Sequence, residues 1–214
     1  MSARATAGPT RASAQQRRLA ILEAALRIMA REGLRAVSHR SVAAEAGVPL
    51  AATTYYFSDL EDLITESFLY WSQAQRRVVG DQLAASLALY EHATPGDVDA
   101  LVTALADAAS GYVIEQARTH RDDRVLEFAF LHEAARLPRL RAAVQDRQVE
   151  DRRALERFHA TIGSRNPALD AQVSHSLMLG LEKSALLDDG GGVDRRAIRA
   201  VLEHHLRSVL DTAG

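Results

Sequence analysis

The chain has 214 residues, of which 47% are hydrophobic and 25% are charged, with a formal net charge of −2. This composition supports a packed core and excludes global disorder, while the lack of cysteine excludes disulfide bonds, cysteine-based zinc sites and a thiol nucleophile. No apolar run is long enough to span a bilayer, so we expect a cytoplasmic protein with no membrane partner.

The N-terminal residues are basic and lack the apolar core of a signal peptide. We therefore predict a disordered basic arm over residues 1–14. Residues 1–60 carry a formal charge of +4, whereas residues 61–214 carry −6. This asymmetry indicates that the first quarter meets a polyanion, although a flexible basic tail would explain part of it.

A small helical domain is predicted over residues 15–60, beginning with an amphipathic helix. Apolar side chains recur with helical spacing along 15–32, and Gly33 ends that helix. A later Ser-Asp-Leu-Glu stretch starting at Ser58 matches a capping box that opens a long helix. The boundary between this domain and the body is therefore expected inside the long helix.

Two short helices between these elements are predicted to form a helix-turn-helix. Ser38 is a good N-cap for a helix at 39–46, and Gly47 can adopt the positive φ that ends it. Pro49 suits the first turn of a helix at 49–56. In such a motif the second helix enters the major groove of DNA.

The outer side of the second helix carries three side chains that we expect to face base edges: Leu50, Ala51 and Thr54. Tyr55 and Tyr56 flank this side with phenol groups that can donate to phosphate oxygens, and Arg40 adds a nearby positive charge. The alternative is that the adjacent tyrosines simply pack at a domain seam.

Residues 17–63 resemble the DNA-binding domain of the TetR family, the tetracycline-repressor-like regulators. The matching segments are RRLAILEAALRIMAREG, VSHRSVAAEAGV and TTYYFSDLEDL. The resemblance implies an all-α protein with three N-terminal helices and about six more in a larger body. It also implies a homodimer that represses transcription from double-stranded DNA with an inverted repeat and releases it when a small molecule binds the body.

Carried over by position, the resemblance adds Ser38 to the phosphate contacts. The sequence departs from the family pattern where Ala51-Ala52 replaces a small residue followed by threonine and where Thr54 replaces an aromatic residue. Leu60 stands where the family commonly has a lysine, which removes a phosphate contact. The first two departures leave the operator sequence unassigned.

The range 61–214 is predicted to be a helical domain for effector binding and dimerisation. The segment 125–136 mixes apolar and ionisable side chains, which is typical of an apolar pocket with a few polar groups. The expected lining residues are Phe68, Trp71, Tyr112, Glu127, Phe128, Leu131, His132 and Met178. Each aromatic residue of this set would also serve as plain core.

The segments 167–187 and 194–210 are predicted to form a dimer interface. Two such helices from each subunit would make a four-helix contact around a two-fold axis. The predicted contact residues are Leu177, Gly180, Leu181, Ser184, Val201, Leu202 and Val209. The alternative is that both helices pack only within their own subunit.

Two other classes of function remain open. An all-α enzyme would use Glu127, His132 and Glu133, but their spacing does not bring the three side chains to one point. A helical interaction module would bind an acidic protein or a membrane through its basic head, which leaves the TTYYF segment unexplained. The sequence has no Gly-rich phosphate loop and no credible metal-ligand spacing, so we expect neither metal nor cofactor.

Overall fold

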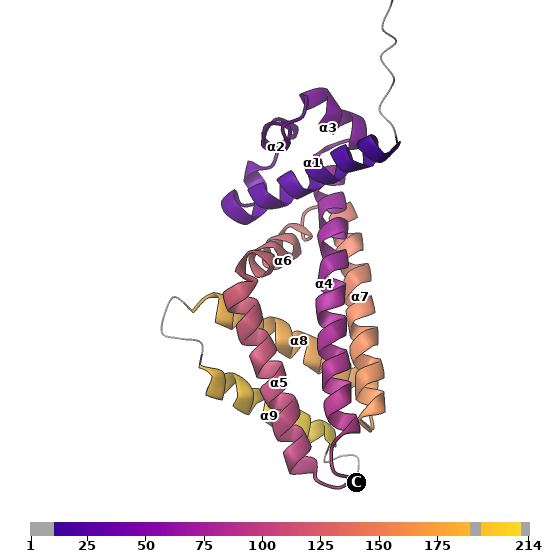
Figure 1. The fold of residues 1–214 in the computed structure, drawn as a ribbon, viewed down its shortest axis with the longest axis vertical. Helices are drawn as coiled ribbons and strands as arrows, with labels where there is room; N and C mark the ends of the chain where they lie inside the picture. Colours follow the sequence, from indigo (N-terminus) through magenta and orange to yellow (C-terminus); the bar gives the residue numbers. More distant parts are fainter. Residues whose placement is uncertain (1–10, 189–193, 211–214) are drawn as a thin grey trace, which may run out of the picture.

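The computed structural model describes residues 11–188 and 194–210, and these residues form helices and turns without a strand (Figure 1). In chain order the helices are α1 (Arg11–Glu32), the 3-10 helix η1 (Leu34–Ala36), α2 (His39–Ala46), α3 (Leu50–Tyr56), α4 (Leu60–Glu91), α5 (Val98–Thr119), α6 (Arg121–Glu133), α7 (Pro138–Thr161), α8 (Pro167–Leu186) and α9 (Arg195–Leu210). The all-α prediction is confirmed. Within the described ranges, no helix has an apolar stretch long enough to span a bilayer.

Helices α1, α2 and α3 form a small head, shown at the top of Figure 1. Its core is built from the apolar face of α1, including Ile21 and Met29, together with Val42 and Phe57, all of which are fully buried. The same cluster continues into the upper body through Phe130 of α6. The head therefore packs on the body through shared apolar contacts rather than through a flexible linker.

The body is built around two long helices, α4 and α7, which run side by side away from the head (Figure 1). Helix α8 packs on α7, and α9 packs along α5. A second apolar cluster, which includes Val102, Val113, Leu202 and Val209, holds this lower part together. Helices α4 to α8 thereby surround an interior region between the two apolar clusters.

Two predicted helix starts differ from the structure. Helix α1 begins at Arg11, so residues 11–14 of the predicted arm are helical, while residues 1–10 lie outside the described residues. Helix α4 is capped by Asp59, whose side chain accepts from the Asp62 backbone N–H at 2.8 Å, and not by Ser58. An aspartate is as good an N-cap as a serine, and here it is the residue with extended backbone at the helix entrance.

Candidate nucleic-acid interface and ligand cavity

The α2–α3 corner is fixed by local caps at both ends of α2. Ser38 accepts a hydrogen bond from the Ser41 backbone N–H at 3.0 Å, and the Ser41 hydroxyl reciprocates by accepting from the Ser38 N–H at 2.9 Å. At the other end Gly47 takes the left-handed conformation with φ of 65°, which glycine adopts without steric cost. Pro49 then caps α3 with φ of −59°.

The inner side of α3 anchors the helix in the head. Thr53 is fully buried, and its hydroxyl donates to the Leu50 carbonyl at 2.8 Å. Phe57 follows α3 and is buried in the head core, with the Arg18 guanidinium 5.5 Å from its ring centre. These contacts fix the rotation of α3 about its own axis and therefore decide which residues face outward.

The outer side of α3 presents apolar and aromatic side chains to solvent. Tyr55 is 82% exposed and Leu50 is 46% exposed, and Ala51 and Thr54 are also exposed beside them. An exposed tyrosine and leucine on such a short helix indicate a contact surface for another molecule. All three residues predicted to face base edges lie on this outer side.

The predicted phosphate contacts surround that side with one partial exception. Ser38 and Arg40 are exposed at the start of α2. Tyr56 is half-buried against the head core and meets Tyr55 edge-on, with ring centres 5.1 Å apart. Arg18 at the start of the head lies against Phe57 and pairs with Glu66 of α4, so its charge is already matched within the chain.

Charged and polar side chains tie the head to the body. Arg139 of α7 donates to Asp59, and its backbone N–H donates to Glu61 at 2.7 Å. Tyr70 donates to Glu23 of α1 at 2.9 Å. These contacts join α1, α4 and α7, so a shift of α4 or α7 in the body would be transmitted to the head.

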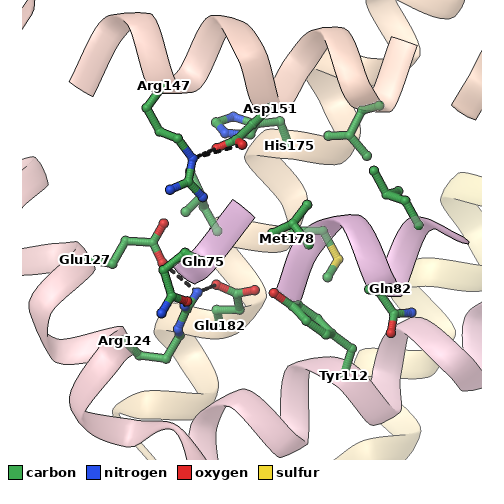
Figure 2. A pocket seen from close by; sticks show the side chains of 14 residues that line it. Gln75, Gln82, Tyr112, Arg124, Glu127, Arg147, Asp151, His175, Met178 and Glu182 are labelled. Atoms are coloured by element: carbon green, nitrogen blue, oxygen red, sulfur yellow. Dashed lines mark hydrogen bonds and ion pairs between the residues drawn. The ribbon is translucent and has the colours of Figure 1, made fainter. Parts of the chain in front are cut away.

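A cavity of about 110 Å³ lies between α4, α5, α6, α7 and α8. We call it the acidic chamber, and it is lined by Gln75, Val79, Gln82, Leu83, Tyr112, Arg124, Glu127, Arg147, Asp151, Leu155, His175, Met178, Leu179 and Glu182. Figure 2 shows its charged side chains grouped at one end, with Tyr112, Met178 and Gln82 toward the other. Such an interior cavity with a few convergent polar groups is the usual form of a small-molecule site.

At the charged end one arginine donates hydrogen bonds to two glutamates. The Arg124 Nη1 atom donates to Glu127 at 2.6 Å and to Glu182 at 2.9 Å, while Nη2 donates to Gln75 at 2.6 Å (Figure 2). Arg124 and Glu182 are almost fully buried. Ionisation of both carboxylates would leave one negative charge without a matching positive charge at this place.

A second arginine is already balanced by its own carboxylate. The Arg147 Nε atom donates to both oxygens of Asp151 at 2.9 and 2.7 Å, and Nη1 donates to the Ser72 carbonyl at 3.1 Å. Arg147 is therefore paired with Asp151 by hydrogen bonds, and its charge also acts on Glu127, where it opposes the rise in pKa that burial causes. The formal charges of the chamber thus sum to one excess negative charge, carried by Glu127 and Glu182.

Burial acts strongly on the ionisable groups of this chamber. Burial, reinforced by the neighbouring Glu127, raises the pKa of Glu182 to about 7, and burial also raises the pKa of Glu127. The pKa of Tyr112 is raised, first by burial and then by Glu182, so its phenol stays neutral. Burial lowers the pKa of His175, which favours the neutral imidazole. The carboxylate pair is therefore the group that would gain most from a cation.

The structure places three of the eight predicted pocket residues in the acidic chamber, namely Tyr112, Glu127 and Met178. Phe68, Trp71 and Leu131 line a neighbouring void of only about 20 Å³ together with Glu127. Phe68 and Trp71 are buried core residues, and the Trp71 indole N–H is occupied by Asp123 at 2.8 Å. Phe128 lines neither the acidic chamber nor this neighbouring void, and His132 is exposed.

The chemistry of the chamber depends mostly on residues that the sequence did not single out. Arg124 and Glu182 belong to α6 and α8 and meet across 58 residues of sequence. Arg147 and Asp151 are one turn apart on α7, and that i, i+4 spacing was the available signal. The same spacing is common on solvated helix faces, so it does not by itself point to an interior site.

The exposed side of α8 and α9 differs from the predicted interface at four positions. Leu202 and Val209 are buried in the chain's own lower core, and Leu177 and Leu181 pack against that core. Leu202 and Val209 are thus used in the core of their own subunit, whereas Leu177 and Leu181 remain half-buried. Gly180, Ser184 and Val201 are exposed, as a contact with a second molecule requires.

Further exposed apolar residues extend this side of α8. Leu169 is 61% exposed and Val173 is 49% exposed, and both share the outer side of the helix with Gly180 and Ser184. Val201 of α9 is 43% exposed. We call Leu169, Val173, Gly180, Ser184 and Val201 the outer stripe.

Comparison with known families supports assignment of both parts of the chain. The family model described as "Tetracyclin repressor-like, C-terminal domain" matches residues 96–211, which is more than half of the chain. The model described as "Bacterial regulatory proteins, tetR family" matches residues 21–66, the range that contains the α2–α3 corner. Among curated protein sequences there is no match.

Several solved structures share the whole architecture. The multidrug binding protein EbrR, complexed with ethidium, is 29% identical, with a TM-score of 0.67, and the match covers 89% of this chain and 98% of that one. A TetR family member of Streptomyces coelicolor A3 is 27% identical, with a TM-score of 0.65 and coverage of 89% and 98%. A transcriptional regulator of Rhodococcus sp. Rha1 shares the fold at 21% identity and a TM-score of 0.65, with coverage of 92% and 97%.

Proposed function

Since the chain belongs to the TetR family of transcriptional regulators, we propose that it is a repressor that binds an inverted-repeat operator as a homodimer and releases it when a small molecule enters the acidic chamber. Membership of this family of DNA-binding regulators sets aside the enzyme alternative. The observation that carries the proposal is the exposed outer side of α3, held in place by the caps of α2 and the buried Thr53.

The outer side of α3 is suited to the major groove of DNA. Leu50 and Ala51 lie at the N-terminal end of the helix, where apolar side chains can contact thymine methyl groups. Thr54 offers both a methyl and a hydroxyl group one turn further on. Arg40 and Tyr55 lie to either side and would fix the helix against the phosphates without reading sequence.

The outer stripe supports a dimer. Gly180 and Ser184 leave room for a second helix to approach α8 closely, and no heavy atom lies within 4 Å of a Cβ built at Gly180. Leu169, Val173 and Val201 would lose their exposed apolar area in such a contact. A two-fold axis along this stripe brings two heads together, and two recognition helices read an inverted repeat.

The acidic chamber is placed to couple ligand binding to the heads. It lies between α4 and α7, and Arg139 of α7 bonds to Asp59 and Glu61 at the start of α4 beside the head. A ligand that separates or tilts α4 and α7 would move the head and change the distance between the two recognition helices. The similarity to EbrR, solved with ethidium and with malachite green, supports a small and mostly apolar effector.

The proposal is tested with the full chain and the DNA upstream of its own gene. Fluorescence anisotropy should give saturable binding of two chains per site, and light scattering should give twice the monomer mass of 23.3 kDa. A monomeric chain with full operator affinity would contradict the proposal.

Gly180→Arg locates the dimer contact, because it places a large cation in the middle of the outer stripe. This variant should be monomeric and should lose at least about 100-fold in operator affinity, since one half-site is lost with the partner. Gly80→Arg is the matched control, because Gly80 is also an exposed helical glycine with open space around it, but on α4. If Gly180→Arg remains a dimer like the control, the outer stripe is not the interface.

A further inference from the structure

A second cavity of about 100 Å³ adjoins the acidic chamber. Four side chains line both cavities: Gln82, Leu83, Leu155 and Met178. In Figure 2 Met178 and Gln82 lie away from the cluster of charges around Arg124, and both also line the second cavity. The two cavities are therefore neighbours, and we interpret them as two chambers of one elongated site.

The second chamber, here named the histidine chamber, has largely apolar walls. Leu105, Phe158, Leu202 and Leu206 from α5, α7 and α9 supply most of its surface. Its polar groups among the lining residues lie chiefly in one short chain of hydrogen bonds. The Ser174 hydroxyl lies 2.8 Å from Nε2 of His159 and 2.7 Å from Nε2 of His205.

This chain of hydrogen bonds is uncharged. The single Ser174 proton can be donated to only one of the two imidazoles, so the other imidazole donates its Nε2–H to the hydroxyl. Burial lowers the pKa of His159 to about 4 and also lowers that of His205. Both rings are therefore neutral at physiological pH, and the histidine chamber carries no charge to match an ionised ligand group.

The two chambers thus differ in charge at opposite ends of one site. The acidic chamber holds Glu127 and Glu182 on a single arginine, Arg124, whose two Nη atoms donate to protein groups while its buried Nε–H has no partner among the described residues. An anionic ligand would have to displace those contacts and face the carboxylates. A cation would supply the missing positive charge and allow both carboxyls to ionise, whereas a neutral ligand would leave them to be neutralised by a proton.

The volumes set the shape of the ligand. A cavity of about 150 Å³ in another protein binds one benzene ring, and each chamber here is smaller than that. A ligand confined to either chamber would be very small, with little apolar area to bury. A ligand that gains substantial binding energy must therefore extend past the shared side chains and occupy both chambers.

We propose that the effector is an elongated monocation whose charged nitrogen lies between Glu127 and Glu182 and whose uncharged apolar arm passes Met178 into the histidine chamber. The proposal rests on the proposed function, because it names the chemical class of the ligand for that same site.

Three probes with the same chain and different head groups test the charge. Calorimetry on the full chain without DNA should show that octylammonium binds about tenfold or more tightly than octan-1-ol, and that octanoate binds most weakly. Equal affinity for the three probes, or preference for octanoate, would overturn the assignment of the cation.

A series from butylammonium to decylammonium tests the length of the site. Affinity should rise roughly fourfold per methylene group as the chain fills the histidine chamber, and then level off. An affinity that does not change beyond butylammonium would show that the arm does not enter the second chamber.

Two substitutions test the two ends separately. Glu182→Gln keeps the shape but removes the charge, so octylammonium should lose about tenfold in affinity while octan-1-ol is unchanged. Ala109→Leu fills the histidine chamber from α5, so octylammonium should bind no more than about threefold better than butylammonium. Ala100→Leu, an exposed site on the same helix, should behave as the wild type.

If Ala109→Leu does not fold, Ser86→Leu serves for the same test, because it fills the same chamber from α4. Normal length dependence in a folded chamber-filling variant would contradict the proposal.

Operator binding, measured separately, distinguishes failure of the ligand class from failure of the proposed ligand-responsive function. Selective binding of octylammonium without any change in operator affinity would refute the ligand-responsive function but leave the site intact. Operator release by a compound in a chain that shows no preference for monocations would refute only the ligand class.

Discussion

The α2–α3 corner and the acidic chamber are both contact sites, yet they are built in opposite ways. The corner occupies about twenty consecutive residues, and its caps are hydrogen bonds between residues three positions apart, as between Ser38 and Ser41. The chamber is assembled by five helices, and the bonds that cross between these helices join residues far apart in sequence, such as Arg124 and Glu182. The corner is therefore held by local hydrogen bonds that each contribute little, whereas the chamber depends on a few buried charges whose removal lowers the free energy of unfolding strongly.

Removal of the shared arginine should have the largest effect. Arg124→Met leaves Glu127 and Glu182 buried without their common partner, which should lower the free energy of unfolding by about 3–5 kcal/mol. Urea denaturation measures this loss. Adding Glu182→Gln to the variant should restore part of the stability, since it removes one uncompensated carboxylate.

The matched control for that change is Arg118→Met, which removes an exposed arginine from α5 and should cost less than about 0.5 kcal/mol. Equal losses in the two arginine variants would show that the buried charges do not govern the stability of the body.

The pH dependence of stability should reveal the carboxylate pair. The pKa of Glu182 is raised from its ordinary 4.5 to about 7, so the folded protein binds its proton more tightly than the unfolded chain does. Its contribution is therefore fully present below pH 4.5 and lost as pH rises through about 7, by an amount on the order of 3 kcal/mol. Glu182→Gln should remove this slope. Other ionisable groups of the chamber also face Glu182, so the quantity to measure is the difference between wild type and variant. These groups are Arg124, Glu127, Tyr112, Arg147, Asp151 and His175.

The head contains a carboxyl group whose pKa is shifted in the opposite direction, which allows a comparison. The hydrogen bond from Arg27 holds the pKa of the half-buried Glu45 below its ordinary value, so its contribution is present above that value and lost as pH falls. The difference curve for Glu45→Gln should therefore slope in the other direction. A common slope for the two variants would contradict the contrast between the regions.

Loss of the local cap should have a moderate effect. Ser38→Ala removes the acceptor for the Ser41 N–H and should cost about 1 kcal/mol of unfolding free energy. Ser58→Ala should cost only a few tenths of that, because Asp59 and not Ser58 caps α4. A larger loss at Ser58 than at Ser38 would show that the caps are assigned to the wrong residues.

The sequence predicts most of the corner because its determinants are local. Ser38 supplies a capping hydroxyl, Gly47 permits the left-handed conformation and Pro49 fixes φ, and the structure places all three at the ends of α2 and α3. The choice between Ser58 and Asp59 was not decidable in this way, since adjacent residues of similar capping strength differ only in which one adopts the extended conformation.

The chamber was only partly predictable because burial and pairing are properties of the assembled helices. Tyr112, Glu127 and Met178 were predicted, but nothing near Glu182 in sequence indicates that Arg124 will meet it. The outer stripe was only partly predictable for the same reason. Residues spaced by four along α8 drift around a helix of 3.6 residues per turn, so Leu169 and Val173 face outward while Leu181 turns toward the core.

The smallest effects should appear on the outer side of α3. Tyr56→Phe should weaken binding by about 0.5–1 kcal/mol on operator and unrelated DNA alike, because a phosphate contact carries no sequence information. Thr54→Ala should weaken binding mainly on the preferred operator, since its side chain faces base edges. Selection from randomised DNA with each variant measures both quantities. Identical losses and identical selected sequences for the two variants would show that the assignment of faces is wrong.

The most direct test joins the two regions in one titration. Operator affinity is measured by anisotropy for the wild-type chain, first alone and then with octylammonium at a concentration that calorimetry shows to be saturating. We expect the ligand to weaken operator binding by about 1–3 kcal/mol, roughly 5- to 150-fold, and octanoate at the same concentration to have no effect. An operator affinity that is unchanged at full occupancy of the acidic chamber would contradict the coupling of the two regions.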